Sequence, residues 1–201
     1  MKKDIMRLGL ALALFAAGAC VALALVYTVT EPTIAGLERE QLEASLKDLF
    51  PGADGFEPIT SGLDSGTPAV TFSGSWKASK AGETLGVAVK GAASSYGGDA
   101  VMLVGVSSEG RIVGARVMTL VDTPGLGANA TNPSYFVDKA SKTTFTGQFS
   151  GKAVGDAFEV KKDVVAISAS TITSKALTSI VKEAGGAGSA WLAANAAGGT
   201  R

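Results

Sequence analysis

The stretch Ser168-Ala169-Ser170-Thr171-Ile172-Thr173-Ser174 marks the beginning of the last helix of this chain. It separates an apolar, strand-like segment from a run whose apolar residues recur with helical spacing. Free backbone N–H groups and the positive end of the helix dipole meet at such a point and favour an anion, such as a phosphate. A hydroxyl there could also carry a phosphate covalently. The alternative is a Ser/Thr-rich helix cap without a ligand, which is a common arrangement.

The composition restricts the chemistry. The chain has 201 residues, 18 basic and 18 acidic, with one cysteine and no histidine. Its length suits one domain with additions, and without a basic excess no nucleic acid is expected as a partner. The lack of histidine excludes Ser-His-Asp and Cys-His catalysis and His-ligated zinc. The single cysteine, Cys20, excludes internal disulfides and thiolate clusters. Any redox chemistry therefore requires an organic cofactor, and no catalytic or metal-binding residue is assigned.

The N-terminal region is typical of a membrane anchor. Residues 8–29 are apolar and uncharged, and about 22 residues form a helix of about 33 Å, enough to span a bilayer. Because basic residues precede this run, the positive-inside rule places residues 1–7 in the cytoplasm and the rest of the chain outside it. A cleaved signal peptide, or a lipoprotein cleaved before Cys20, are the alternatives. The length of the run, and Tyr27 at its end, favour an uncleaved single-span anchor in the cell membrane.

The rest of the chain divides by composition. Residues 30–67 are predicted to hold an amphipathic helix that begins at Thr30 and Pro32 and ends at Pro51-Gly52, followed by a polar linker. Residues 68–185 form the main domain. Residues 186–201 are rich in glycine and alanine and are interpreted as a loose tail.

The main domain carries strand signals before its last helix. Apolar residues alternate or run continuously in four segments, 70–76, 85–89, 100–106 and 112–120. Residues 107–110 suit a hairpin turn. A short helix is expected after Asn132-Pro133, two short strands within 158–167, and a helix over 173–183. Strands that precede a final helix predict an α+β domain with an antiparallel sheet.

A second motif lies at the end of the last of these four segments. In Asp122-Thr123-Pro124-Gly125-Leu126-Gly127, Pro-Gly predicts a type II turn, because proline fixes φ and glycine accepts a positive φ. The two glycines also let backbone N–H groups approach a flat ligand or a phosphate. A tight turn with no ligand is the alternative.

Together the two motifs resemble the FMN-binding domain family. Thr-Pro-Gly-Leu-Gly at 123–127, followed roughly 40 residues later by S-x-x-T-I-T-S at 168–174, is similar to the family pattern E-T-P-G-L-G and S/T-G-A-T-x-T/S. Tyr96-Gly97-Gly98 resembles the family's G-Y-x-G, and residues 149–152 resemble its F-x-G-K. Members of the family include the G subunit of the Rnf ion-translocating electron-transport complex and the C subunit of the sodium-translocating NADH:quinone oxidoreductase. The single anchor and the short chain resemble the former.

The resemblance implies an electron carrier. It implies FMN joined through its phosphate to the hydroxyl of Thr171 by a flavin transferase that acts outside the cytoplasm, and other membrane subunits of a complex as partners. The implied fold is a transmembrane helix followed by an antiparallel-sheet domain with the flavin on a turn at a helix N-terminus. The other residues assigned to the FMN site come from both motifs: Thr123, Pro124, Gly125, Leu126, Gly127, Ser168, Ala169, Ser170, Ile172, Thr173 and Ser174.

The sequence departs from the family pattern at three positions. Ala169 and Ser170 replace the Gly-Ala pair, and Asp122 replaces glutamate. If the family glycine needs a positive φ, alanine at 169 costs on the order of 1 kcal/mol. A membrane-anchored assembly or binding module with a degenerate, cofactor-free site is therefore a second hypothesis. A third is a hydrolase with Ser168 or Ser170 as nucleophile and Lys175 as base.

Overall fold

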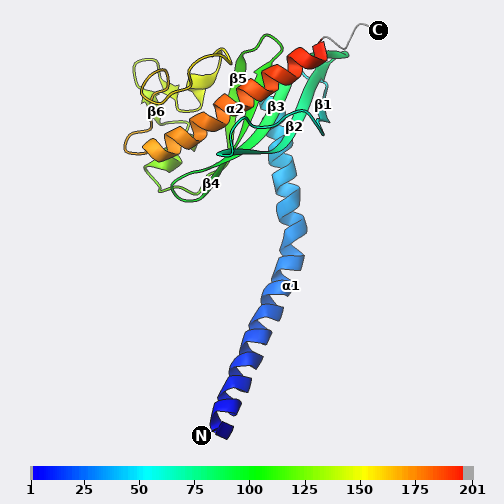
Figure 1. Cartoon of the computed structure of the whole chain (residues 1–201), viewed down its shortest axis with the longest axis vertical. Coiled ribbons are helices and arrows are strands. Elements are labelled where there is room, and N and C mark those ends of the chain that lie inside the picture. Colours follow the sequence, from blue (N-terminus) through cyan, green and yellow to red (C-terminus); the bar gives the residue numbers. More distant parts are fainter. Residues whose placement is uncertain (1, 197–201) are drawn as a thin grey trace. The chain divides into compact units, whose positions relative to one another are not determined.

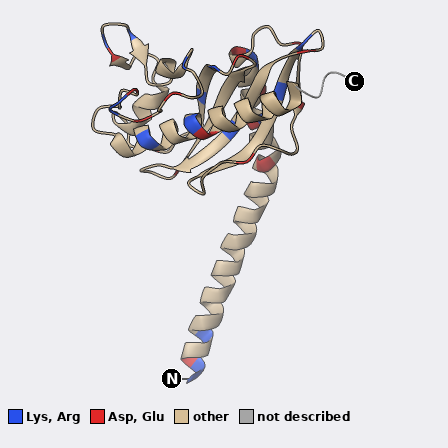
Figure 2. Cartoon of the chain, turned by 45° about the horizontal axis from the view of Figure 1, so that its top comes forward, with Lys and Arg blue, Asp and Glu red and all other residues tan. Residues whose placement is uncertain are grey.

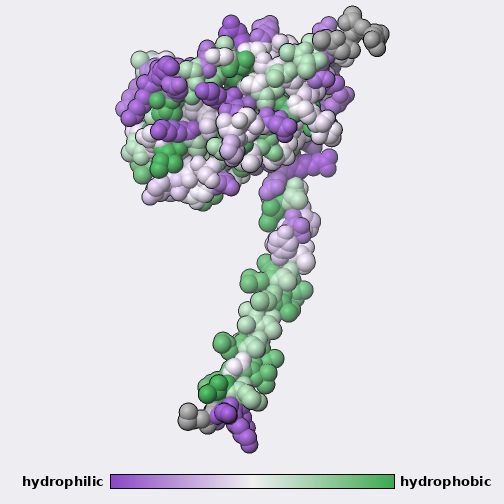
Figure 3. Space-filling view, viewed as in Figure 1, coloured by the Kyte–Doolittle hydropathy of each residue, from purple (hydrophilic) through white to green (hydrophobic). Residues whose placement is uncertain are grey.

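A computed structural model describes residues 2–196 of the chain and divides it into two units, with the boundary between Glu43 and Ala44. The first unit lies within helix α1, which runs over Lys2–Leu49. Among the described residues this is the one helix long and apolar enough to cross a membrane. Figure 2 marks charged residues at its N-terminal end, followed by a long uncharged stretch, and Figure 3 shows the apolar surface of that stretch.

The break predicted at Thr30 and Pro32 is absent, because α1 continues through both residues. Proline removes one backbone donor, but its fixed φ is close to that of a helix. The threonine hydroxyls just before Pro32 bond to the helix backbone and do not cap a new helix. Thr28 Oγ1 donates to the Leu25 carbonyl at 2.9 Å, and Thr30 Oγ1 donates to the Val26 carbonyl at 2.9 Å. The apolar anchor and the amphipathic segment thus form one helix, and the separate helix predicted from residue 30 is wrong.

The second unit is built on an antiparallel sheet. Its strands are β1 (Gly55–Pro58), β2 (Val70–Lys80), β3 (Glu83–Ser94), β4 (Asp99–Ser107) and β5 (Ile112–Thr119), which pair in sequence order. Helix α2 (Thr171–Ala196) lies across one face of this sheet, as Figure 1 shows. A two-stranded sheet of β6 (Phe136–Asp138) and β7 (Thr143–Thr144) follows β5 in sequence. The predicted α+β class, the four strands and the hairpin turn at 107–110 are confirmed.

Helix α2 is longer than predicted, since residues 186–196 extend it and do not form a loose tail. The glycines of this region explain the difference. A Cβ on Gly185 would lie 3.0 Å from Ile112, and one on Gly188 would lie 3.0 Å from Val106. The bare backbone of α2 thus packs directly on β4 and β5, and Leu192 is buried one turn further on. Residues 197–201 of the predicted tail lie outside the described residues.

The opposite face of the sheet receives the residues at the end of α1. The ring of Phe50, which is 5 % exposed, lies over Gly86 and Gly105, and Leu49 lies over Gly114. These three glycines lie on three neighbouring strands, and larger residues there would collide with Phe50 or Leu49. The two side chains are therefore part of the core of the second unit.

Phe50→Ala is expected to lower the free energy of unfolding by about 3–5 kcal/mol, because it leaves a cavity over Gly86 and Gly105, which have no side chains to fill it. Urea denaturation of the purified chain measures this loss. Val165→Ala, which shortens an apolar side chain that is 50 % exposed, is the control and should cost less than about 1 kcal/mol. Equal losses for the two variants would contradict the buried role of Phe50.

Two smaller predictions are wrong. The short helix expected after Asn132-Pro133 is absent; a 3₁₀ turn, η1 (Gly127–Thr131), precedes this pair and β6 follows it. The segment 158–167 forms no strand, only an isolated bridge between Val160 and Val164. Asp163 closes this segment into a loop by accepting the N–H groups of Phe158 and Glu159 at 3.1 and 2.7 Å. Another 3₁₀ turn, η2 (Gly147–Phe149), places Phe149 in the core.

Candidate functional site

A cavity of about 520 Å³ lies at the N-terminus of α2. Three segments that are far apart in the sequence form it: the turn between β3 and β4, the segment after β5, and the beginning of α2. Its volume lies within the range of small-molecule and cofactor sites. The lining residues are Tyr96, Asp122, Thr123, Leu126, Gly127, Ala169, Ser170, Thr171, Ile172 and Thr173.

The segment after β5 forms the predicted type II turn. The N–H of Leu126 donates to the carbonyl of Thr123 at 3.1 Å, and Gly125 has a φ of 77°. A positive φ at the third residue of the turn is the geometry that requires glycine. The turn brings Leu126 and Gly127 to the cavity, while Pro124 and Gly125 shape it without lining the cavity.

The first turn of α2 offers its backbone to the same cavity. Its first helical hydrogen bond runs from the Ser174 N–H to the Ser170 carbonyl, at 3.0 Å, so the N–H groups of Thr171, Ile172 and Thr173 precede the hydrogen-bonded ladder. Such groups, with the helix dipole, suit an anion. Thr171 is exposed, whereas Ser170 is only 7 % exposed. Thr171 thus carries the more accessible hydroxyl of the two.

The two serines at the ends of the motif stabilise the turn and do not line the cavity. Ser174 is fully buried; its hydroxyl donates to the Ser170 carbonyl at 2.8 Å and accepts the Ile167 N–H at 2.9 Å. The N–H of Ser168 donates to the hydroxyl of Tyr135 at 3.2 Å. The sequence did not identify Tyr135 as part of this site, because only the fold brings it beside a turn 33 positions away.

Asp122 lies at the centre of the polar contacts. Its carboxylate accepts hydrogen bonds from Ser95 Oγ at 2.8 Å, from the Gly97 N–H at 2.6 Å and from Thr173 Oγ1 at 2.5 Å. Burial raises the pKa of this carboxyl, but the hydrogen bonds from Thr173, Ser95 and Gly97 outweigh burial and hold its pKa below the ordinary value. Asp122 is therefore an anion at neutral pH. The sequence marked it as a departure from the pattern and not as a site residue.

Ala169 adopts the left-handed conformation that favours glycine, with a φ of 58°. The condition under which alanine is costly at this position, a positive φ, is therefore met. A Cβ in this conformation is strained.

Ala169→Gly is therefore expected to raise the free energy of unfolding by about 0.5–1 kcal/mol, after allowance for the greater freedom of glycine in the unfolded chain. Urea denaturation measures the change. Ala190→Gly, on the exposed face of α2, should have the opposite sign and cost about 1 kcal/mol. A loss of stability at both positions would contradict the strain.

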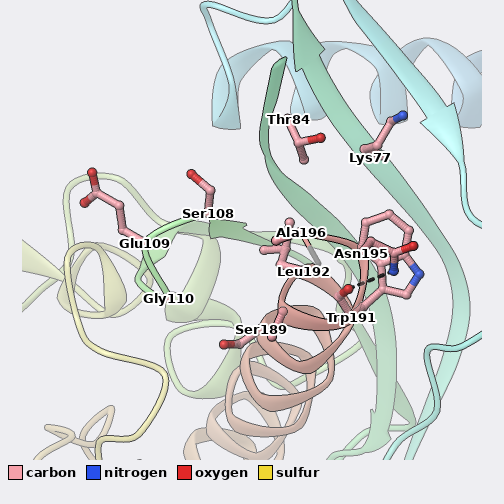
Figure 4. A pocket seen from close by; sticks show the side chains of 11 residues that line it. Lys77, Thr84, Ser108, Glu109, Gly110, Ser189, Trp191, Leu192, Asn195 and Ala196 are labelled. Atoms are coloured by element: carbon pink, nitrogen blue, oxygen red, sulfur yellow. Dashed lines mark hydrogen bonds between the residues drawn. The ribbon is translucent and has the colours of Figure 1, made fainter. Parts of the chain in front are cut away.

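A larger cavity, of about 650 Å³, lies at the other end of α2 (Figure 4). Trp191, Asn195 and Ala196 of the helix border it, together with Lys77 of β2 and Glu109 of the hairpin turn. Within this cavity Asn195 Nδ2 donates to the Trp191 carbonyl at 2.8 Å. No residue of the 122–127 or 168–174 motif lines this cavity. The smaller cavity, which both motifs line, is therefore the better candidate for the functional site.

Two protein-family models match this chain, one over the domain that holds the smaller cavity and one over the N-terminal helix. The FMN-binding domain model matches residues 95–185, which include all three segments around the smaller cavity. The model of the RnfG N-terminal region matches residues 1–49, which include all of α1.

Three relatives, each the G subunit of its complex, cover most of the chain. The one from the proton-translocating ferredoxin:NAD(+) oxidoreductase complex of Clostridium ljungdahlii is 32% identical and covers 82% of this chain and 80% of its own. The one from an ion-translocating oxidoreductase complex of Methanosarcina acetivorans is 33% identical, with coverages of 90% and 93%. The one from the Na(+)-translocating ferredoxin:NAD(+) oxidoreductase complex of Acetobacterium woodii is 31% identical, with 88% of each.

The chain belongs to the RnfG family, the G subunits of ion-translocating oxidoreductase complexes. The two matched regions of this RnfG family chain are an FMN-binding domain and the N-terminal region that contains the apolar helix α1. Among solved structures, NqrC of Shewanella oneidensis is similar, with a TM-score of 0.46, 16% identity and coverage of 72% of this chain and 73% of its own.

The cavity suits FMN on its own geometry. The N–H groups at the beginning of α2, which have no helical hydrogen bond, and the exposed Thr171 hydroxyl suit a phosphate. The exposed side chains of Leu126, Ile172 and Tyr96 offer a largely apolar surface to a flat ring. Gly127 lets its segment approach Asp122 closely, since a Cβ there would lie 2.5 Å from Asp122 Oδ2.

Proposed function

We propose that this chain is a membrane-anchored electron-carrying subunit of an Rnf-type complex, with FMN attached by a phosphoester to Thr171. The exposed hydroxyl of Thr171, one residue past a buried serine at an anion-favouring helix end, is the observation that carries the proposal. When bound, the flavin supplies the redox chemistry. The protein provides the attachment point, the pocket and the anchor.

The attachment is a transfer that a separate flavin transferase would catalyse. Thr171 Oγ1 forms a bond to the FMN phosphorus of FAD, the pyrophosphate bond to the AMP half breaks, and the hydroxyl proton leaves with AMP. A covalent bond retains a small soluble cofactor on a domain outside the cytoplasm. Lys2, Lys3 and Arg7 at the beginning of α1 support this orientation, with the N-terminus in the cytoplasm.

The partners proposed are the other membrane subunits of such a complex. Ion translocation belongs to the complex as a whole, because residues 8–29 of the proposed span carry no ionisable side chain other than those of Cys20 and Tyr27.

Mass spectrometry of the chain purified from its native membrane tests the proposal. Trypsin should release the peptide from Asp163 to Lys175 with the added mass of one FMN less one water, and fragmentation should place that mass on Thr171. A peptide of unmodified mass from native material, together with colourless protein, would contradict the proposal and favour the cofactor-free assembly module.

A further inference from the structure

The carboxylate of Asp122 joins the three segments that form the cavity. It accepts two hydrogen bonds from the turn between β3 and β4, given by Ser95 Oγ and the Gly97 N–H, and one from Thr173 Oγ1 in the first turn of α2. Asp122 itself begins the segment with the type II turn. Its bond to Thr173 spans 51 positions of sequence and its bonds to the other turn span 25 and 27. One side chain therefore ties together parts of the chain that local structure cannot connect.

The packing around the carboxylate is close. A Cβ on Gly127 would lie 2.5 Å from Asp122 Oδ2 and 2.6 Å from Thr173 Oγ1. Thr173 is 1 % exposed, so its hydroxyl has little access to water as an alternative partner. The half-buried carboxylate thus packs directly against the backbone of Gly127, which also lines the cavity.

All three partners donate a hydrogen bond to Asp122. The side chain at this position must therefore accept three hydrogen bonds. A carboxylate accepts at both oxygens and suits three donors. An amide of the same shape would turn its NH₂ toward a donor and leave one of the contacts unsatisfied.

We propose that Asp122 is the positioning residue of the flavin pocket, and that its carboxylate fixes the Tyr96 turn and the Leu126–Gly127 segment against the first turn of α2. This inference rests on the proposed function for the identity of the ligand. Asp122 acts through Gly97 and Thr173. It keeps the attachment point on α2 and the apolar residues of the other two segments in one geometry, which attachment and ring burial both require.

Four variants separate positioning from general stability. Asp122→Asn keeps the shape and removes the anion, Thr173→Val removes one donor, and Thr173→Ser keeps it. Asp138→Asn is the matched control: Asp138 accepts the Ser141 hydroxyl at 2.7 Å and the Ala140 N–H at 2.9 Å, and it does not line the cavity. The Thr173 pair keeps the test informative if Asp122→Asn does not fold.

Hydrogen exchange tests whether Asp122 holds the three segments together. It is measured on the full-length chain, made without flavin transferase and kept in detergent. In Asp122→Asn and Thr173→Val, the hydrogen-bonded amides of residues 95–97 and 174–177 should exchange about tenfold faster than in the wild type. Thr173→Ser and Asp138→Asn should stay within about threefold of it.

Flavin loading tests the positioning, in the same variants made together with a flavin transferase. Asp122→Asn and Thr173→Val should carry about tenfold less covalent flavin after a fixed time. The fluorescence anisotropy of the flavin that they do carry should fall toward that of free FMN. Thr173→Ser should restore most of both values.

Wild-type exchange rates in Asp122→Asn and Thr173→Val would overturn the proposal. So would faster exchange with wild-type loading and anisotropy, because Asp122 would then support the fold without placing the flavin. If the wild type itself takes no flavin, the proposed function fails. The exchange rates of flavin-free protein then decide separately whether Asp122 holds the three segments together.

Discussion

Thr171→Ala is expected to abolish covalent flavin. The substitution removes the one exposed hydroxyl in the first turn of α2 and leaves the helix otherwise unchanged, so stability should stay within about 0.5 kcal/mol of the wild type. Chain made together with a flavin transferase, then denatured and separated on a gel, should show a fluorescent band under ultraviolet light only where the hydroxyl is present. The expected result is a bright wild-type band and none for Thr171→Ala.

Ser170→Ala is the matched control for this experiment. Ser170 is adjacent and also a hydroxyl residue, but it is 7 % exposed, and its backbone carbonyl accepts the hydrogen bonds of Ser174. Its band should therefore match the wild type. Fluorescence that persists in Thr171→Ala and disappears in Ser170→Ala would move the attachment site by one residue. A dark wild-type band would instead favour the cofactor-free module.

The sheet was predictable because its determinants are local. Alternating apolar residues over 70–76 and 85–89, a continuous apolar run over 100–106 and a Gly110 turn each specify a strand or a connection within a few positions. All of them are present in β2 to β5. The bulges in the pairing of β2 with β3 and of β4 with β5 leave no comparable pattern in the sequence, since they depend on both partners.

Two of the wrong predictions share one cause, which is tertiary context. Glycine and alanine after residue 185 have the composition of a loose tail. They form a helix because Gly185 and Gly188 fit against Ile112 and Val106. Likewise, apolar residues at 158–167 suggested strands, but Asp163 holds them in a loop by backbone hydrogen bonds.

The site was predictable in its motifs and not in its contacts. The type II turn and the helix start follow from local residue types, and the positive φ of Ala169 is one that the glycine of the family pattern adopts without strain. That Ser174 would be buried within the turn, or that Tyr135 would contact Ser168, requires knowledge of segments at long sequence separation. The same holds for the three donors to Asp122.

Gly97→Ala is expected to disrupt the pocket at its most crowded backbone contact. A Cβ at residue 97 would lie 1.7 Å from the carbonyl oxygen of Val121 and 3.1 Å from Asp122 Oδ1. The first of these neighbours is backbone and cannot turn away, so the turn that carries Tyr96 must move away from the end of β5. The free energy of unfolding should fall by about 1–3 kcal/mol, and covalent flavin loading should fall with it, because the Gly97 N–H also leaves the Asp122 carboxylate.

Gly155→Ala makes the comparison specific to this contact. Gly155 is exposed, and a Cβ there meets nothing within 4 Å, so stability should change by less than about 0.5 kcal/mol and loading should stay at the wild-type level. Urea denaturation and absorbance of the purified flavoprotein measure the two quantities. If Gly97→Ala loses stability and still loads fully, the turn supports the fold but does not shape the flavin site. If it loses neither, the close approach of Gly97 to Val121 is not a feature of the native domain.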